Sequence, residues 1–370
     1  MVENRSGISG FVEQMHIGKL KTIAAKFTQE LKDAQAGKTT SLPFIIHELS
    51  PSSIVADGEV FQSLVIGGTV GNVATLKKTR DNIEILEKKE KTELAFKSKE
   101  DFLAFVSSNL PDNIDVLALN FAYPIEPVLE NGKLDGILIA VTKEGGFHDL
   151  VGKKIGKEVE DYVLATRNKK IRVAVANDTV CLLAAGLSQF EEKELAAGIV
   201  GTGFNIAFFL DKNILVNLES ANFDKFPHTK EGQIVDKESA QPGKSHFEKE
   251  TAGAYLYRHF NSILKEHNID YHISSTEELD KISHKNIPRI SEIARNLLIR
   301  SAQLVACQIA GVVSFMDRSM VFNMEGSLFW KGNNYKETVE QTIKKLVLDH
   351  SVRFVEIENS AFLGAAKLVA

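Results

Sequence analysis

Asp178 lies where an apolar, β-branched run changes abruptly into helix-forming residues, in Arg172-Val-Ala-Val-Ala-Asn-Asp-Thr-Val-Cys-Leu-Leu-Ala-Ala-Gly186. This pattern predicts a strand, a polar corner at Asn177-Asp178-Thr179 and then a helix. In α/β folds ligands bind outside the carboxyl ends of strands, so a carboxylate there faces a bound molecule and can act as a catalytic base. The alternative is that Asp178 or Thr179 only caps the following helix, as such residues commonly do. The stretch alone leaves both interpretations open.

Two glycine turns, Gly67-Gly68-Thr69 and Gly201-Thr202-Gly203, each separate a pair of apolar runs, at 60–77 and 196–210. Glycines at such a tip let successive backbone N–H groups approach an anion, although an ordinary hairpin turn is the simpler interpretation of either alone. The spacing matches neither a dinucleotide fingerprint nor a Walker-type loop. Two copies predict two related lobes, the arrangement that clamps a nucleoside triphosphate in the actin-like kinase architecture.

Composition bounds the class of protein. The chain has 370 residues, of which 44% are hydrophobic and 25% charged, with a formal net charge of −5. This length favours two lobes, and nothing indicates disorder or a basic surface for nucleic acid. The two cysteines are expected to be reduced core thiols, which fits a cytoplasmic setting. The start has no signal-peptide core, and the longest apolar stretch, 301–316, is shorter than the ~20 residues that span a bilayer, so no membrane segment is expected.

Hydrophobic periodicity and turn residues predict alternating helices and strands along the chain. The expected helices are 11–36, 99–109, 149–166, one after Asp178, one from 247, 289–316 and 336–346. The expected strands are those of the two glycine hairpins, 83–94, 114–120, 136–141, 172–176, 213–218, 319–323 and 352–357. Residues 224–246 are expected to form a solvated or mobile loop, and Ser275-x-x-Glu278 a capping box.

Nine motifs occur in order along most of the chain. They are Leu42-Pro43, Gly67-Gly68-Thr69, Thr142-Lys143, Asn177-Asp178-Thr179-Val180, Val200-Gly201-Thr202-Gly203-x-Asn205, Asn217-Leu218-Glu219, Phe247-Glu248-Lys249, Gly326-Ser327-Leu328 and Gly364-Ala365-Ala366. Their order and approximate spacing resemble a eukaryotic-type hexokinase of single-unit length. The resemblance implies an α/β, actin-like ATPase (ribonuclease H-like) fold with two lobes and a cleft between them. The implied small lobe is 53–172 plus 358–370, and the implied large lobe 1–52 plus 173–357.

The resemblance implies transfer of the γ-phosphate of ATP, with Mg²⁺, to the 6-hydroxyl of a hexose such as glucose. The implied catalytic residues are Asp178, as base, and Lys143. The implied sugar-binding residues are Thr142, Lys143, Asn177, Asp178, Asn205, Glu219 and Glu248. The implied nucleotide-binding residues are Gly67, Gly68, Thr69, Gly201, Thr202, Gly203, Gly326, Ser327 and Ser360. No protein ligand to a metal is assigned, and a monomer or homodimer is expected.

The chain departs from the family pattern at several positions. The family has an acid just before Gly-Gly-Thr, at the metal–phosphate end of the site, and an arginine shortly after it, where this chain has Val65 and Asn72. A serine of the sugar loop is replaced by Ala122, and residues 359–363 replace a glycine- and serine-rich adenosine loop. Val65 favours an alternative, a hexose-binding regulator with weak or no kinase activity, whereas the retained Asp178 and Lys143 favour the enzyme. A third possibility is an actin-like assembly protein, against which the set of sugar-binding residues argues.

Overall fold

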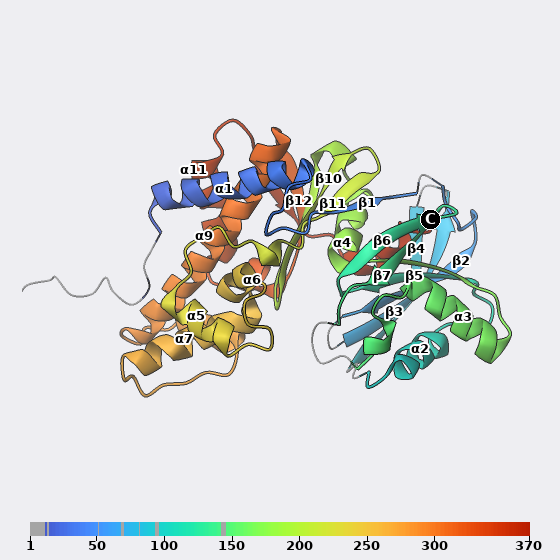
Figure 1. Cartoon of the computed structure of the whole chain (residues 1–370), viewed down its shortest axis with the longest axis horizontal. Helices are drawn as coiled ribbons and strands as arrows, with labels where there is room; N and C mark the ends of the chain where they lie inside the picture. The colour runs from blue at the N-terminus through green and yellow to red at the C-terminus, as the bar shows by residue number, and fades with distance from the viewer. Residues whose placement is uncertain are drawn as a thin grey trace, which may run out of the picture. The chain divides into compact units, whose positions relative to one another are not determined.

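The computed structural model describes residues 12, 15–50, 52–67, 70–80, 82–92, 96–141 and 146–370. The chain divides into two compact units, each built from several segments (Figure 1). Unit 1 comprises residues 1–44, 198–206 and 218–354, and unit 2 comprises 45–197, 207–217 and 355–370. The predicted large lobe includes residues 173–197, whereas these residues have most of their contacts with unit 2. The assignment of lobes therefore stays a prediction.

Unit 2 contains a five-stranded sheet in the order β4-β3-β2-β5-β8. Its strands are β2 (Val60–Ile66), β3 (Val70–Thr79), β4 (Asn82–Thr92), β5 (Val116–Phe121) and β8 (Arg172–Ala176). The first three strands are antiparallel, whereas β2, β5 and β8 are parallel to one another. The three parallel strands consequently end at the same edge of the sheet, where β8 leads into Asp178.

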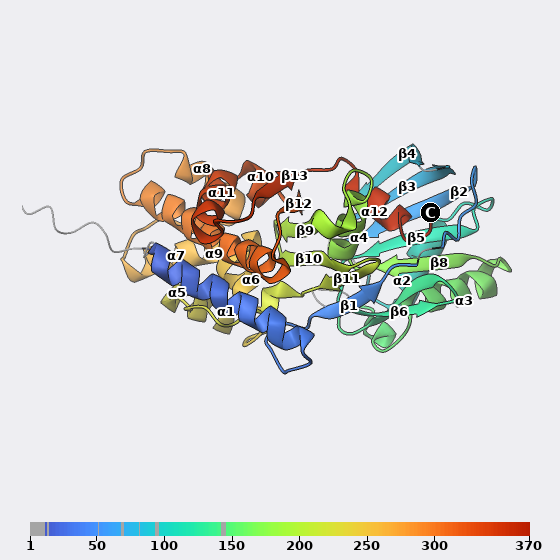
Figure 2. The same cartoon turned by 90° about the horizontal axis from the view of Figure 1, so that it is seen from above.

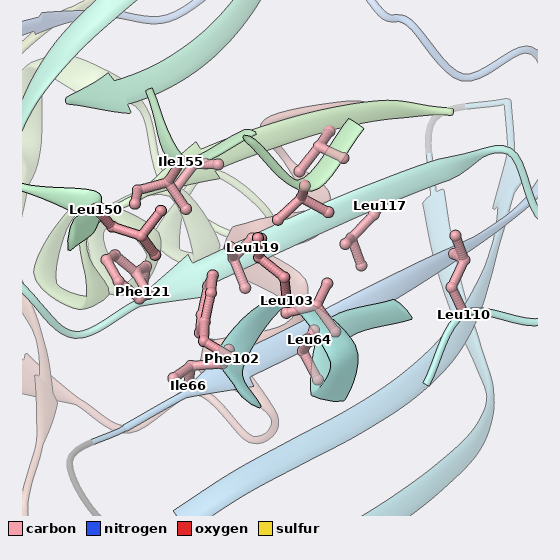
Figure 3. Packing of buried hydrophobic residues seen from close by; sticks show 14 of the residues in the cluster. Leu64, Ile66, Phe102, Leu103, Leu110, Leu117, Leu119, Phe121, Leu150 and Ile155 are labelled. Carbon is pink, nitrogen blue, oxygen red and sulfur yellow. The ribbon is translucent and has the colours of Figure 1, made fainter. Parts of the chain in front are cut away.

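One face of this sheet packs on helices α2 (Lys99–Ser108) and α3 (Ile155–Arg167). The side chains on this face alternate along each strand, as in Leu64 and Ile66 of β2, and they are almost fully buried. Figure 3 shows Phe102 of α2 against Ile66, and the ring of Phe102 lies 5.7 Å from that of Phe121. This cluster is the hydrophobic core of unit 2.

The opposite face of the sheet carries helix α12 (Ser360–Ala366), which also packs on α4 (Asp178–Gly186). Ser63 Oγ donates a hydrogen bond to the carbonyl of Phe362 (3.4 Å), and Asn120 Nδ2 donates to that of Ala361 (3.2 Å). Gly364 permits the close approach of α12 to α4, because an added Cβ would lie 1.7 Å from the carbonyl oxygen of Cys181. Helix α12 therefore connects α4, the helix that Asp178 begins, to the sheet.

The remaining elements of unit 2 are two strands that pair with each other (β6 and β7), two strands of a larger sheet (β1 and β11) and two short 3-10 helices (η1 and η2). They are β1 (Ile45–Glu48), β6 (Ile125–Glu130), β7 (Lys133–Leu138), η1 (His148–Leu150), η2 (Glu192–Glu194) and β11 (Ile214–Asn217). A six-stranded sheet contains, in spatial order, β1, β11, β10 (Phe204–Asp211), β9 (Leu195–Val200), β12 (Met320–Glu325) and β13 (Val352–Val355). Strands β9 (Leu195–Val200) and β10 (Phe204–Asp211) each have residues in both units.

Unit 1 is largely helical. Its long helix α9 (Ile290–Met316) packs beside α1 (Ile17–Gln35) and α11 (Tyr335–Leu346), as Figures 1 and 2 show. Its other elements are η3 (Ser220–Asn222), α5 (Lys230–Lys237), α6 (His246–Thr251), α7 (Gly253–Glu266), α8 (Thr276–Ser283), β12 (Met320–Glu325), α10 (Ser327–Lys331) and most of β13 (Val352–Val355).

Most predicted elements are present, but two predictions were wrong and one strand was missed. The polar stretch 224–246 contains helix α5, which Thr229 caps by accepting a hydrogen bond from the amide of Gly232 at 2.8 Å. The helix expected from 149 begins at Ile155, after the short turn η1. Strand β6 was not predicted; it pairs with β7 through a turn at Asn131-Gly132. The capping box is partial: Ser275 caps α8, whereas Glu278 binds Ser274.

Helix α9 is longer than the apolar stretch that the sequence singles out. By length and composition it could span a membrane, but 83% of its most apolar window is buried, as in the core helix of a folded domain. Cys181 and Cys307 are both buried and form no disulfide with each other, which confirms the prediction of core thiols. Burial raises the pKa of the Cys307 thiol, so this group is kept in its neutral form.

Candidate active site

Asp178 is the first residue of α4 and directly follows β8 and Asn177. The helix cap is Asn177, whose side-chain oxygen accepts from the amide of Thr179 at 3.0 Å. Asp178 Oδ1 also accepts from this amide, at 2.7 Å, and from Thr179 Oγ1 at 3.2 Å. Asp178 is partly exposed, whereas Asn177 and Thr179 are buried. The cap therefore does not depend on Asp178 alone, and the carboxylate keeps an accessible surface at the end of the parallel strands.

Asn177 is held by three internal contacts of unit 2. Besides capping α4, its Oδ1 accepts from Nδ2 of Asn217 at 3.3 Å, and its Nδ2 donates to the carbonyl of Tyr123 at 3.4 Å. These bonds fix the orientation of the corner that carries Asp178. Burial raises the pKa of Tyr123, so its hydroxyl stays protonated. Asn217 belongs to one of the nine motifs but was not assigned a role, although its polar side chain at the end of β11 was an available signal. Tyr123, the residue after Ala122, contributes through its backbone carbonyl, which no side-chain pattern indicates.

The second glycine turn lies in unit 1 and packs against two neighbouring turns. The amide of Gly201 donates to the carbonyl of Gly203 at 3.0 Å. The amide of Gly253, at the start of α7, donates to the carbonyl of Gly201 at 2.7 Å. Gly326 has a φ of +123°, and an added Cβ there would lie 2.1 Å from the oxygen of Val200. The turn that leads to Ser327 packs directly on the backbone of Val200 and Gly201. Because of this close approach, no larger residue fits at Gly326 without moving the backbone.

Asn205, Glu219 and Glu248 are positioned around this turn. Asn205 Oδ1 accepts from the amide of Ser220 at 3.1 Å, which fixes the backbone at Glu219, whose φ is +47°. Glu248 Oε2 accepts from the amide of Phe204 at 3.0 Å. Glu219 and Glu248 are both partly exposed. Unit 1 thus brings two carboxylates, an amide side chain and three glycine-rich backbone segments together, as required for binding hydroxyl groups and phosphates.

The part of unit 2 that the sequence resemblance assigns to the phosphates departs from the family pattern at two paired positions. Val65 on β2 is directly opposite Asn72 on β3, and on its other side it is opposite Asn120 on β5. The two positions that depart from the family are therefore cross-strand partners. Within the described residues, the Oδ1 atoms of Asn72 and Asn120 are buried without a hydrogen-bond partner.

The three neighbouring side chains Asn72, Val65 and Asn120 form a row across β3, β2 and β5, and this row offers few ligands for Mg²⁺. The described residues contain no group of three or more His, Cys, Asp or Glu side chains that could hold a metal ion. Amide oxygens such as those of Asn72 and Asn120 can accept hydrogen bonds from metal-bound water, whereas valine offers no ligand. The row therefore fits a hydrated Mg²⁺ carried by phosphate groups better than one bound directly by the protein.

Four predicted site residues, Gly68, Thr69, Thr142 and Lys143, lie outside the described residues. Gly67 directly follows β2 and is partly exposed, Thr202 and Ser327 are exposed, and Ser360 begins α12. Unit 2 therefore brings together Gly67, Asn177, Asp178 and Ser360 around the ends of its sheet. Unit 1 brings together Gly201, Thr202, Gly203, Asn205, Glu219, Glu248, Gly326 and Ser327.

Solved structures of known proteins share the fold of this chain. The hexokinase from Schistosoma mansoni complexed with glucose superposes with a TM-score of 0.82 at 18% identity, over 96% of each chain. The ROK hexokinase from Thermus thermophilus has a TM-score of 0.60 at 15% identity, over 84% of this chain and 98% of that one. The fold is that of the actin-like ATPases, as the sequence predicted.

Sequence comparison indicates a family within this fold class. The family model described as hexokinase matches residues 195–269 and 258–370. Hexokinase-1 of Spinacia oleracea is 24% identical over an alignment 440 positions long, which covers 96% of this chain and 88% of that protein. The family-model match, the curated hexokinases and the hexokinase structures together support a member of the hexokinase family. Family and fold together support a kinase that acts on a hexose.

Proposed function

We propose that this protein transfers the γ-phosphate of ATP to the 6-hydroxyl of a hexose such as glucose, with Asp178 as the base. The observation that carries the proposal is the position of Asp178, a partly exposed carboxylate at the common end of parallel strands, on a corner that Asn177 holds in place. In addition, the Schistosoma mansoni hexokinase of the same fold is complexed with glucose.

In the proposed reaction Asp178 takes the proton of the primary hydroxyl, and the hydroxyl oxygen forms a bond to the γ-phosphorus as the bond to the ADP oxygen breaks. Phosphoryl transfer requires mainly positioning and charge stabilisation, with one group to orient the nucleophile. Asn205, Glu219 and Glu248, with Thr142 and Lys143, bind the sugar hydroxyls in this proposal. The glycine turns and Ser327 bind the phosphates, and Mg²⁺, when bound, neutralises charge on them.

A coupled assay of ADP formation with a panel of hexoses tests the proposal. Hexose-dependent ADP release at catalytic rates supports it. If no hexose stimulates ADP release although hexoses bind, the regulator is the better description. Val65 and Asn72 favour that second function, because the acid and arginine of the family are replaced together at two paired positions.

Glu248 provides a test of the sugar site. We expect Glu248→Gln to raise the KM for hexose roughly tenfold, because an amide in place of a carboxylate weakens a charged hydrogen bond. Glu219→Gln is expected to have the same effect. The matched control is Glu238→Gln, an exposed residue near the end of α5, which should leave KM unchanged. Hexose titrations of both site variants that superimpose on the parent curve would place the sugar elsewhere.

Val65 distinguishes a kinase with a weak metal site from a regulator. In a kinase, Val65→Asp should raise kcat, or lower the Mg²⁺ concentration for half-maximal activity, by about tenfold, since a carboxylate adds a charged acceptor for metal-bound water. Val65→Asn, which adds an amide without charge, is the control and should give little gain. A parent without phosphoryl transfer to any hexose that Val65→Asp leaves unchanged would contradict the kinase proposal.

A further inference from the structure

Unit 1 contains a pocket of about 290 Å³ that shares no residue with the candidate active site. Its walls come from α1, the segment Pro227–Thr229, the start of α5, and helices α6, α7 and α9. Most of these elements are charged on this side, with Lys19, Lys230 and Arg300 facing Glu231 and Glu250. The lining thus has three cationic side chains and two carboxylates.

Arg300, on α9, is the buried cation of this pocket, with a side chain only 6% exposed. Its Nη2 donates to the carbonyl of Pro227 at 3.2 Å and lies 3.5 Å from Oε2 of Glu250. Its Nε is buried without a hydrogen-bond partner among the described residues. A guanidinium has five N–H groups, so most of the donors of this buried charge are unsatisfied by protein.

Glu250 compensates this charge only in part, because its oxygens serve another purpose. Oε1 of Glu250 accepts from the amide of Thr229 at 2.8 Å and from its Oγ1 at 3.0 Å. Oε2 lies 3.3 Å from the same hydroxyl. Glu250 therefore mainly holds the residue that caps α5, and its contact with Arg300 is at the limit of hydrogen-bond distance. Burying a poorly paired charge is unfavourable, so a further anion near Arg300 would stabilise it.

We propose that this pocket binds a small molecule carrying a phosphate or carboxylate group, held by the guanidinium of Arg300. A guanidinium matches the oxygens of either group in a bidentate geometry. Lys19 and Lys230 also line the pocket, and Lys230 is in an ion pair with Glu266, so Arg300 is the cation on which the proposal rests. His228, stacked on Phe226 with 4.8 Å between ring centroids, adds a polar edge to the same wall.

The test measures thermal unfolding of the full chain without hexose, nucleotide or Mg²⁺. Inorganic phosphate and, separately, malonate are titrated, with sodium chloride at matched ionic strength as reference. We expect at least one of the two anions to raise Tm in a saturable manner, because a ligand that binds only the folded state stabilises it. The anion that acts identifies which of the two groups the pocket prefers.

Two substitutions assign this response to the pocket. Arg300→Met, which removes the charge and keeps an unbranched side chain, should abolish the response, and Arg300→Lys should weaken the apparent affinity about tenfold, since the planar fork is lost. Lys345→Met, an exposed residue of α11, is the control and should respond like the parent.

The inference is overturned if neither anion exceeds the salt reference, or if Arg300→Met responds like the parent. If Arg300→Met does not fold, Arg300→Lys decides: an unchanged affinity then contradicts the inference. Because the pocket contains none of the residues assigned to sugar or nucleotide, a negative result leaves the kinase proposal intact.

Discussion

Asp178→Asn is expected to lower kcat by about 10²- to 10⁴-fold, the usual loss when a positioned base is removed. The amide cannot take the proton of the sugar hydroxyl, but it has nearly the same size and retains an oxygen that can accept from the amide of Thr179. Hexose affinity should stay within about tenfold of the parent, because a single hydrogen-bonding group is altered and the other sugar contacts remain.

The structure makes this experiment more informative than the sequence allowed. If Asp178 served only as a helix cap, Asp178→Asn would leave stability and activity per folded molecule nearly unchanged, because asparagine caps a helix as well as aspartate does, whereas Asp178→Ala would cost about 1 kcal/mol of stability. Asn177 already supplies the cap, so we expect little change in unfolding and a large change in rate. Asp211→Asn is the matched control, since Asp211 Oδ1 also accepts from the next amide, that of Lys212, at 2.7 Å, at an exposed site. Parent-like turnover by Asp178→Asn would refute the assignment of the base.

Elements with a strong local signal could be predicted from the sequence. The spacing of Ile23, Phe27 and Leu31 identified α1, and these residues are on its apolar side. Strand β6 was missed because Pro127 interrupts its pattern, although Asn131-Gly132 was a signal for the hairpin. Both of these residues have positive φ, 53° and 73°, as a tight turn of this type requires.

Helix α5 could not be found from periodicity, because it is short and only Gly232 and Val235 are buried. Its stability comes from tertiary contacts: Thr229 caps it, and Glu250, from another helix, binds Thr229. Local propensity says little about a helix that is held in this way. The same contact defines one wall of the pocket at Arg300, so the pocket was equally hidden from sequence analysis.

The candidate site shows the same division between local and long-range information. Motifs identified Asp178 and the glycine turns, because each is a short pattern in one stretch of chain. The pairing of Val65 with Asn72 follows from the hairpin register, but the position of Asn120 on the other side of Val65 depends on a parallel pairing with a distant segment. Without that pairing, the loss of the acid and arginine of the family could not be connected with two unsatisfied amide oxygens.

Gly364→Ala is expected to destabilise unit 2 by about 3 kcal/mol or more, at the upper end of the cost of overpacking. Helix propensity alone predicts the opposite sign, since alanine is favoured over glycine by up to about 1 kcal/mol within a helix. Packing should prevail, because the new Cβ would lie 1.7 Å from the carbonyl oxygen of Cys181 and 2.4 Å from its carbonyl carbon. These are backbone atoms, which cannot turn aside as a flexible side chain can.

The measurement is urea unfolding of Gly364→Ala beside Gly18→Ala, which makes the same chemical change in α1. At Gly18 the added Cβ would meet only Nδ1 of His16, at 3.8 Å, so this control should be as stable as the parent or slightly more stable. To admit the methyl group at Gly364, α12 must move away from α4, the helix that Asp178 begins, so kcat of the folded variant should fall as well. A Gly364→Ala protein with parent stability and parent kcat would show that α12 does not fix the position of α4, and Asp178 would then need another support.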